Sequence, residues 1–168
     1  MKLHSSHLFW AMALLLLNLS ACTVYRETSS SGDYAAKYGK IAIRQMKKYK
    51  IPASITLAQG ILESGHGKSY LAQTANNHFG IKCTADWKGA RAYKDAEIRN
   101  ECFKVKDSYN DHSLFLVNRS RYAGLFQLNI RDYRGWARGL QQYGYATDPA
   151  YATKLIRVIE EYKLYRYD

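Results

Sequence analysis

The chain has 168 residues, with 25 lysines and arginines against 14 aspartates and glutamates, which gives a formal net charge of +11 at pH 7. This length is enough for one domain with a sizeable core and excludes two domains of ordinary size. The strongly basic balance favours a polyanionic partner or an anionic surface, and a surface that is merely soluble is the alternative.

The first 21 residues are typical of an export signal. Lys2 precedes an apolar run from residue 8 to residue 17, which is too short for a mature membrane-spanning helix and suits a signal-peptide core. The run closes on Leu19-Ser-Ala-Cys22, which resembles a bacterial lipobox in which Cys22 carries the lipid and becomes the mature N-terminus. An ordinary secretory signal cleaved nearby is the alternative. Both interpretations take the domain out of the cytoplasm.

Export narrows the choice of anionic partner. Cleavage after residue 21 removes a single charged residue, Lys2, and leaves 147 residues (168 − 21) with a charge of +10 (24 − 14). We expect no nucleic-acid partner for an exported protein, which leaves anionic cell-wall polymers and lipid headgroups. The predicted location is the cell envelope, with the lipid on Cys22 holding the protein to a bacterial membrane, of which the outer membrane is favoured.

Residues 22–33 are polar and rich in serine, which predicts a flexible tether in front of one folded domain over residues 34–168. From Tyr34 to Lys50, apolar residues recur at helical spacing and predict the first helix of that domain.

The second predicted helix carries the carboxylate of most interest. Pro52 suits the first turn, the residues up to Leu62 are mostly apolar, and Gly65 suits the left-handed position just past the end. Glu63 therefore lies in the last turn, where converging carbonyls carry a partial negative charge and apolar neighbours reduce solvation. Both effects raise the pKa of a carboxyl group, and a carboxyl that stays protonated near neutral pH can act as a general acid. The alternative is an ordinary solvated glutamate at a helix end.

A polar, glycine-containing turn follows, Asn76-Asn-His-Phe-Gly-Ile-Lys82, whose amide and aromatic side chains suit a bound sugar. Residues 87–105 then carry turn signals between strand-like positions, which predicts a small β-hairpin.

Cys83 and Cys102 flank this hairpin and are the cysteines that remain once Cys22 is lipidated. An even pair in an oxidising compartment predicts a disulfide at the base of the hairpin, with two buried free thiols as the alternative. Zinc is not expected, because no Cys-x-x-Cys or His-x-x-x-His spacing would complete a four-ligand set.

The rest of the chain predicts three more helices. Asp107 and Asp132 suit the caps of helices that run to about residue 118 and residue 144, and Asp148-Pro149 suits the start of the last helix. The buried face of that last helix is predicted to be Leu155, Ile156, Ile159 and Tyr162.

The segment around Glu63 and the turn from Asn76 to Lys82 together resemble glycoside hydrolase family 73, the bacterial β-N-acetylglucosaminidases that cut peptidoglycan. The resemblance covers most of the mature chain and includes Trp87-Lys-Gly89, residues 109–116, residues 121–123 and residues 144–155. It implies a lysozyme-like α+β fold, in which a helical lobe and a small β-hairpin lobe flank a glycan groove. It implies no metal and no cofactor, and we expect a monomer.

Cleavage of a β-1,4 glycosidic bond requires an acid at the leaving oxygen and a second group that activates water or stabilises the oxocarbenium-like transition state. Glu63 is the expected acid. The family places the second group, a glutamate, on the β-hairpin, but this hairpin is shorter than usual and no residue aligns cleanly. Asp95, Glu97 and Glu101 are the candidates, and Glu101 is favoured on the returning strand. The substrate's own N-acetyl group could instead act as nucleophile.

The family's functional tyrosine in a Gly-Tyr-Ala-Thr motif is matched by Tyr145, whose hydroxyl would bond the acetamido group or the attacking water. Packing under the last helix is the alternative for this tyrosine. Asn77, Phe79 and Trp87 are the predicted substrate-binding residues, since aromatic faces stack on sugar rings. Trp136 is also a candidate, although it is placed nearer to the core than to the groove.

The export signal and the family resemblance together predict an exported, lipid-anchored peptidoglycan hydrolase. The resemblance implies an endo-β-N-acetylglucosaminidase that cleaves the GlcNAc-β-1,4-MurNAc backbone. A catalytically inactive peptidoglycan-binding module is the alternative of another class, because binding needs the groove but not a matched carboxylate pair. A muramidase or lytic transglycosylase on the same architecture is the second enzymatic alternative.

Overall fold

The computed structural model describes residues 30–93, 102–104 and 107–168. Cys22 and the hairpin carboxylates Asp95, Glu97 and Glu101 lie outside these residues. Among the residues described, no helix is both long enough and apolar enough to cross a membrane.

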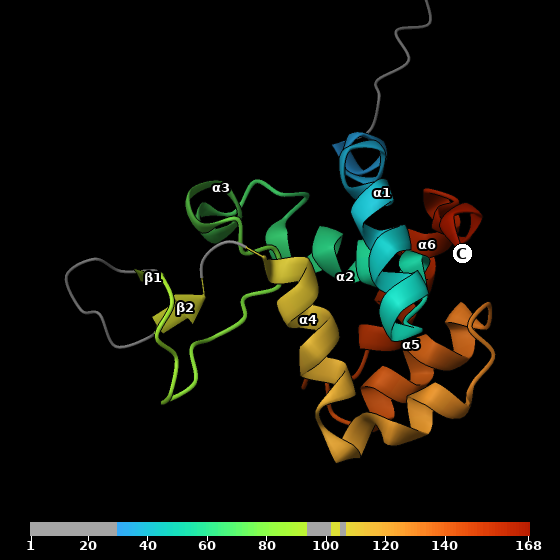
Figure 1. Ribbon diagram of the computed structural model, residues 1–168. Coiled ribbons are helices and arrows are strands. Elements are labelled where there is room, and N and C mark those ends of the chain that lie inside the picture. Colours follow the sequence, from blue (N-terminus) through green and yellow to red (C-terminus); the bar gives the residue numbers. More distant parts are fainter. Residues whose placement is uncertain (1–29, 94–101, 105–106) are drawn as a thin grey trace, which may run out of the picture.

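The described chain combines a helical body with one small sheet (Figure 1). In chain order the elements are α1 (Ser30–Tyr49), α2 (Ala53–Ser64), α3 (Tyr70–Ala75), β1 (Arg91–Tyr93), β2 (Cys102–Lys104), α4 (Ser108–Val117), the 3-10 helix η1 (Ser120–Gln127), α5 (Tyr133–Gln142), α6 (Tyr151–Glu161) and the 3-10 helix η2 (Leu164–Tyr167). In Figure 1 the strands project to the left of α4, and the other long helices gather to its right. The predicted α+β architecture is confirmed.

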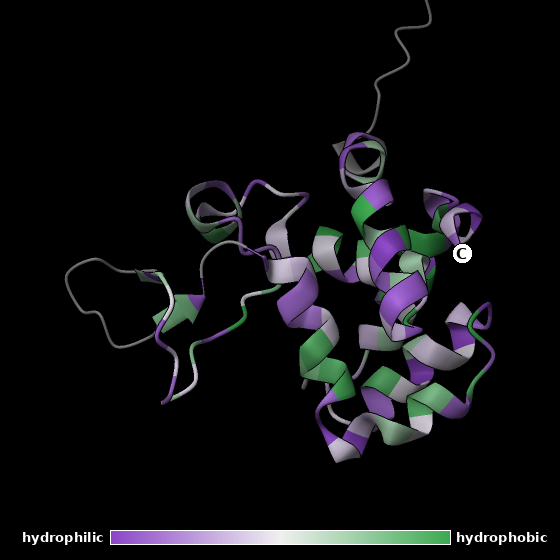
Figure 2. Ribbon diagram, in the orientation of Figure 1, coloured by the Kyte–Doolittle hydropathy of each residue, from purple (hydrophilic) through white to green (hydrophobic). Residues whose placement is uncertain are grey.

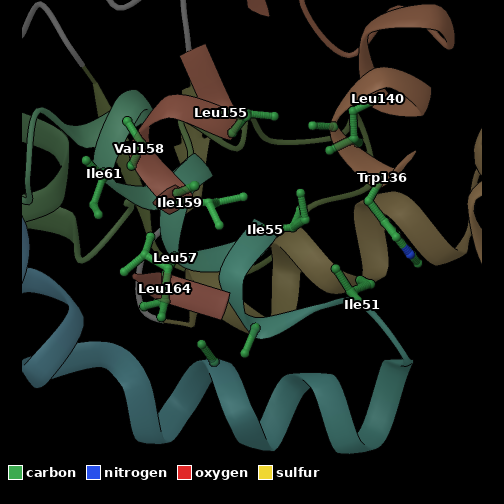
Figure 3. Close-up of a cluster of buried hydrophobic side chains, with 14 of the residues drawn as sticks. Ile51, Ile55, Leu57, Ile61, Trp136, Leu140, Leu155, Val158, Ile159 and Leu164 are labelled. Atoms are coloured by element: carbon green, nitrogen blue, oxygen red, sulfur yellow. The ribbon is translucent and has the colours of Figure 1, made fainter. Parts of the chain in front are cut away.

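The core is built around α2. Every residue from Ala53 to Ile61 is buried, and α1, α5, α6 and η2 all pack against this helix. Figure 3 shows Ile55 and Leu57 of α2 in the same cluster as Leu155 and Ile159 of α6. Because burial of one such aliphatic side chain stabilises a fold by about 1.5–3 kcal/mol, this packing holds the end of α2 firmly in place.

The two ends of α2 follow local chemistry. Pro52 is the N-cap residue with a φ of −51°, one position earlier than the predicted first turn, and Gly65 is the C-cap with a left-handed φ of 53°. The amide of Gly65 donates to the carbonyl of Ile61 and closes the helix end. A Cβ at Gly60 would lie 2.4 Å from the hydroxyl of Tyr34, so a glycine at this position lets α1 pack closely against α2.

The first helix begins earlier than the sequence predicts. α1 starts at Ser30, so the last residues of the predicted tether, 30–33, are helical. Asp33 lies in the first turn, where a carboxylate is stabilised by the positive end of the helix dipole. A polar composition indicates weak core packing but does not by itself prevent a helix from extending outward.

The predicted caps of the later helices are confirmed. Asp107 accepts a hydrogen bond from the amide of Asn110, and Asp132 accepts one from the amide of Gly135. In α6, Leu155 and Ile159 are fully buried and Ile156 and Tyr162 are partly buried, as expected for the inner face.

Trp136 belongs to the core and not to a groove. Its side chain is 1 % exposed and meets the ring of Phe126 edge to face, with 5.4 Å between the ring centroids.

Three short elements have no counterpart in the sequence analysis. They are α3 and the two 3-10 helices η1 and η2. The six residues of α3 are too few to show helical periodicity, although Ser69 caps its start by accepting a hydrogen bond from the amide of Ala72. Both 3-10 helices have a tighter winding than the α-helical pattern that sequence periodicity detects.

The hairpin is fastened to the loop that precedes it. β1 and β2 are antiparallel, and Tyr93 pairs with Cys102. A disulfide joins Cys83 to Cys102, with 5.3 Å between their Cα atoms, and the amide of Cys83 donates to the carbonyl of Cys102 at 2.8 Å. The described part of the hairpin is therefore held at its base to the segment that follows the predicted sugar-binding turn.

Candidate active site

A cavity of about 640 Å³ lies between the helical body and the hairpin. Glu63 from the end of α2 lines it, together with the loop 79–84, β2 and the outward face of α4. Tyr145, just after α5, closes another part of the wall. The wall thus combines aromatic side chains with a few charged ones, a mixture that is common in ligand-binding clefts.

Glu63 is held by one hydrogen bond within the described residues. Its side chain reaches solvent in the cavity, and the hydroxyl of Tyr151 donates to its Oε1 at 3.3 Å. Protein atoms surround enough of the carboxyl group that burial raises its pKa, while the Tyr151 hydrogen bond acts in the opposite direction. The net effect extends the protonated form of Glu63 to higher pH, which suits a general acid.

Tyr145 lines the cavity and also packs against its neighbours. Its ring stacks on that of Tyr151, with 5.6 Å between centroids and an interplanar angle of 21°. Burial, followed by the nearby Tyr151 and Glu63, raises the pKa of Tyr145 well above 10. Its hydroxyl therefore stays protonated and able to donate throughout the useful pH range.

Asn77 does not present its amide to the cavity. The residue is 1 % exposed, and its side-chain amide exchanges two hydrogen bonds with the backbone of Ile81, both at 3.0 Å. The same Nδ2 also donates to the carbonyl of Lys104 at 2.9 Å. Asn77 therefore shapes the turn and ties it to β2, instead of contacting a sugar from an exposed position.

Phe79 and Trp87 lie in different places. Phe79 lines the cavity of Glu63, and its largely buried ring stacks on His112 with 4.2 Å between centroids. Trp87 lines a separate depression of about 610 Å³ beside the end of α3, and the Nζ of Lys104 lies 4.3 Å from the centroid of its ring. Of the predicted aromatic pair, Phe79 is at the cavity and Trp87 is outside it.

A carboxylate that sequence reasoning missed also lines the cavity. Asp111 projects from α4, and its Oδ1 lies 3.4 Å from the Nζ of Lys104. Within the described residues, Asp111 is the second carboxylate of the cavity beside Glu63, since Glu101 lies outside them. The helical spacing of residues 111, 115 and 118, all of which line the cavity, is the sequence signal that could have placed Asp111 there.

Metal ligands do not cluster in the part of the chain that the structure describes. No group of three or more His, Cys, Asp or Glu side chains is arranged there to hold an ion.

Residues 39–164 match the glucosaminidase family, whose description is mannosyl-glycoprotein endo-beta-N-acetylglucosaminidase. The chain belongs to this family. The exo-glucosaminidase LytG of Bacillus subtilis is 37% identical over 139 residues, which are 73% of this chain and 48% of LytG. The peptidoglycan hydrolase FlgJ of Salmonella typhimurium is 33% identical over 150 residues, 81% of this chain and 48% of FlgJ. The chain therefore spans about half the length of these curated relatives.

The solved structures agree with this membership. The glycoside hydrolase domain of Salmonella typhimurium FlgJ matches the present structure with a TM-score of 0.68 at 31% identity. The match covers 79% of this chain and 88% of that domain. The predicted lysozyme-like fold of the glucosaminidase family is confirmed.

Proposed function

We propose that this glucosaminidase is an exported, lipid-anchored endo-β-N-acetylglucosaminidase that cleaves the GlcNAc-β-1,4-MurNAc backbone of peptidoglycan. The observation that carries the proposal is Glu63, a carboxyl group with a raised pKa at the wall of an open cavity in a glucosaminidase fold. Two relatives, FlgJ and a hydrolase from Sphingomonas sp. A1 of known structure, are named as peptidoglycan hydrolases, which supports the choice of substrate.

In the proposed reaction, Glu63 donates its proton to the glycosidic oxygen as the bond breaks. Tyr151 bonds one carboxyl oxygen, so the other oxygen is available to carry the proton towards the substrate. Phe79, Phe115 and Tyr145 supply apolar surface along the cavity for the faces of the sugar rings. The hydroxyl of Tyr145 is suited to donate to the carbonyl of an acetamido group.

The second group of the reaction has five candidates, four of them carboxylates. Glu101 remains the proposal from the sequence, with Asp95 and Glu97 as alternatives on the same hairpin. Asp111 joins them because it lines the same cavity as Glu63, although its pairing with Lys104 also suits a structural role. The fifth candidate is the substrate's own acetamido group. Glu101→Gln, Glu97→Gln, Asp95→Asn and Asp111→Asn separate the carboxylates, since loss of turnover in one variant alone identifies the partner, and equal small effects in all four favour the acetamido group.

The basic surface supports an anionic environment for the protein. Along α1, one exposed face carries Lys37, Lys40, Arg44, Lys47 and Lys48. Figure 2 shows hydrophilic residues recurring along this helix. No ion pair joins these side chains to any carboxylate in residues 30–93, 102–104 and 107–168. Such a face attracts anionic wall polymers or lipid headgroups. This agrees with a protein that is anchored to an envelope membrane through Cys22.

Digestion of purified peptidoglycan, followed by borohydride reduction and mass spectrometry, tests the activity and the bond together. An endo-glucosaminidase yields muropeptides that end in reduced N-acetylglucosamine. A muramidase yields reduced N-acetylmuramic acid, and a lytic transglycosylase yields a non-reducible anhydro product. An exo-acting enzyme, as the name of LytG describes it, releases single sugars. An absence of products with retained binding to peptidoglycan would identify a binding module.

A further inference from the structure

A line of three hydrogen bonds runs from the buried interior to Glu63. Nε2 of His112 on α4 lies 3.0 Å from Oε1 of Gln59 on α2. Nε2 of Gln59 donates to the hydroxyl of Tyr151 on α6 at 2.9 Å, and this hydroxyl donates to Glu63 at 3.3 Å. The line thus joins three helices and ends at the proposed acid.

We propose that His112 and Gln59 are positioning residues that hold Tyr151 as a hydrogen-bond donor to Glu63 and so fix which carboxyl oxygen carries the acid proton. This inference rests on the role of Glu63 in the proposed function.

The direction of the line follows from the chemistry of the amide. The oxygen of a glutamine side chain only accepts hydrogen bonds and its nitrogen only donates them. With Oε1 of Gln59 facing His112, the imidazole must therefore carry its proton on Nε2. Burial lowers the pKa of His112 to about 3, so the ring is neutral and has a single proton to place. Its Nδ1 has no hydrogen-bond partner among the described residues, which suits an unprotonated acceptor better than a buried N–H.

The consequence at the other end is a fixed orientation of the Tyr151 hydroxyl. Because its oxygen already accepts from Gln59, its proton is directed at Oε1 of Glu63. The acid proton then belongs on Oε2, which no described residue bonds. Once that proton leaves, the carboxylate receives a charge-assisted hydrogen bond from Tyr151, and such bonds are stronger than neutral ones. The line thereby stabilises the product form of the acid.

The burial of these polar groups argues against packing as their sole purpose. Gln59 and His112 are both 0 % exposed and adjoin the apolar cluster around α2. Burying an amide or an imidazole costs free energy unless its hydrogen bonds are made, and an aliphatic side chain would fill the same volume without that cost. The ring of Phe79 stacks on His112 and separates it from the cavity.

The variants below leave the other charged and titratable groups near Glu63 unsubstituted. Tyr145 is a direct neighbour, and the remaining ones that line the cavity are Lys82, Lys104, Asp111 and Arg119. A change in the pH dependence of the variants below therefore reports on the line itself.

The test is the pH profile of kcat/KM on soluble glycan fragments. The acid must be protonated, so the rate falls as pH rises through the pKa of Glu63, and a hydrogen bond from Tyr151 to the carboxylate holds that pKa down. Gln59→Met, His112→Met and Tyr151→Phe should each move this alkaline limb upward by about one pH unit and lower kcat about fivefold to tenfold, with little change in KM. His112→Gln keeps a donor near the Nε2 position and should retain the wild-type limb.

If the alkaline limb of the kcat/KM profile moves in Tyr151→Phe but stays unchanged in Gln59→Met, the inference is overturned. Equal behaviour of His112→Met and His112→Gln would do the same. The nitrogen chemical shifts of His112 in the unaltered enzyme give a check that needs no variant, because a proton on Nδ1 contradicts the proposed direction. Full activity of Glu63→Gln would instead overturn the proposed function, so the two failures are distinguishable.

Discussion

Replacement of Glu63 by glutamine removes the proposed acid proton while leaving the shape of the side chain almost unchanged. The amide oxygen can still accept the hydrogen bond that Tyr151 donates to Oε1 at 3.3 Å. The buried residues of α2 hold the helix end in the same position. What is lost is therefore the proton alone, and general acid catalysis contributes a factor of about a hundred to ten thousand. We expect kcat/KM to fall by that factor, which corresponds to about 3–5 kcal/mol of transition-state stabilisation.

Peptidoglycan digestion quantified by reduced muropeptides measures this loss, and binding of glycan fragments measures what remains. Binding should survive, because the amide can bond the same glycosidic oxygen. The melting temperature should not fall, since the amide keeps the size of the side chain and its hydrogen bond from Tyr151. Glu161→Gln is the matched control, because the same chemical change at an exposed glutamate that does not line the cavity should leave the rate unaltered. A Glu63→Gln enzyme that digests peptidoglycan at near the original rate would refute the acid assignment.

Three further predictions concern stability and location. Reduction of the Cys83–Cys102 disulfide, which spans 19 residues, should lower the free energy of unfolding by about 2–4 kcal/mol in urea titrations, and a double Cys→Ser variant should not respond to reductant. Cys22→Ala should leave the protein soluble or uncleaved in fractionated cells, while the unmodified protein partitions with membranes. Stability should also fall as pH drops from 6.5 towards 3, because the unfolded chain takes up a proton at His112, whose pKa the fold lowers from 6.5 to about 3. His112→Gln should flatten that slope in urea unfolding at successive pH values.

Each of these predictions has a clear opposite. Free thiols at both Cys83 and Cys102 in protein isolated from its native compartment would contradict the predicted contribution of the disulfide. Equal membrane partitioning and processing of the Cys22→Ala and unmodified proteins would contradict the proposed lipid anchor at Cys22. An unchanged pH slope in His112→Gln would show that His112 titrates in the fold as it does in the unfolded chain.

Local chemistry made the helix of the proposed acid predictable. A proline, an apolar run and a glycine at the left-handed position define α2 from its own residues, and these placed Glu63 in its last turn. The caps of α4 and α5 were predictable for the same reason, because Asp107 and Asp132 bond amides only three residues away. Such features need no knowledge of distant parts of the chain.

The surroundings of Glu63 depended on packing between distant segments. Tyr151 lies 88 residues from Glu63 in the sequence, Gln59 lies 92 residues from Tyr151, and His112 lies 53 residues from Gln59. No periodicity or spacing relates residues so far apart, because their contact follows from how α4 and α6 pack on α2.

The same limit explains the site residues that the sequence placed differently. The polar composition of the turn suggested that Asn77 faces a sugar, yet its amide satisfies the backbone of the turn and of β2. Trp87 was grouped with Phe79 by residue type, but the fold separates them into two depressions. Asp111 was overlooked although it lies beside the cavity. Residue type and spacing set which side chains can do the chemistry, whereas the direction each one faces is decided by long-range packing and hydrogen bonding.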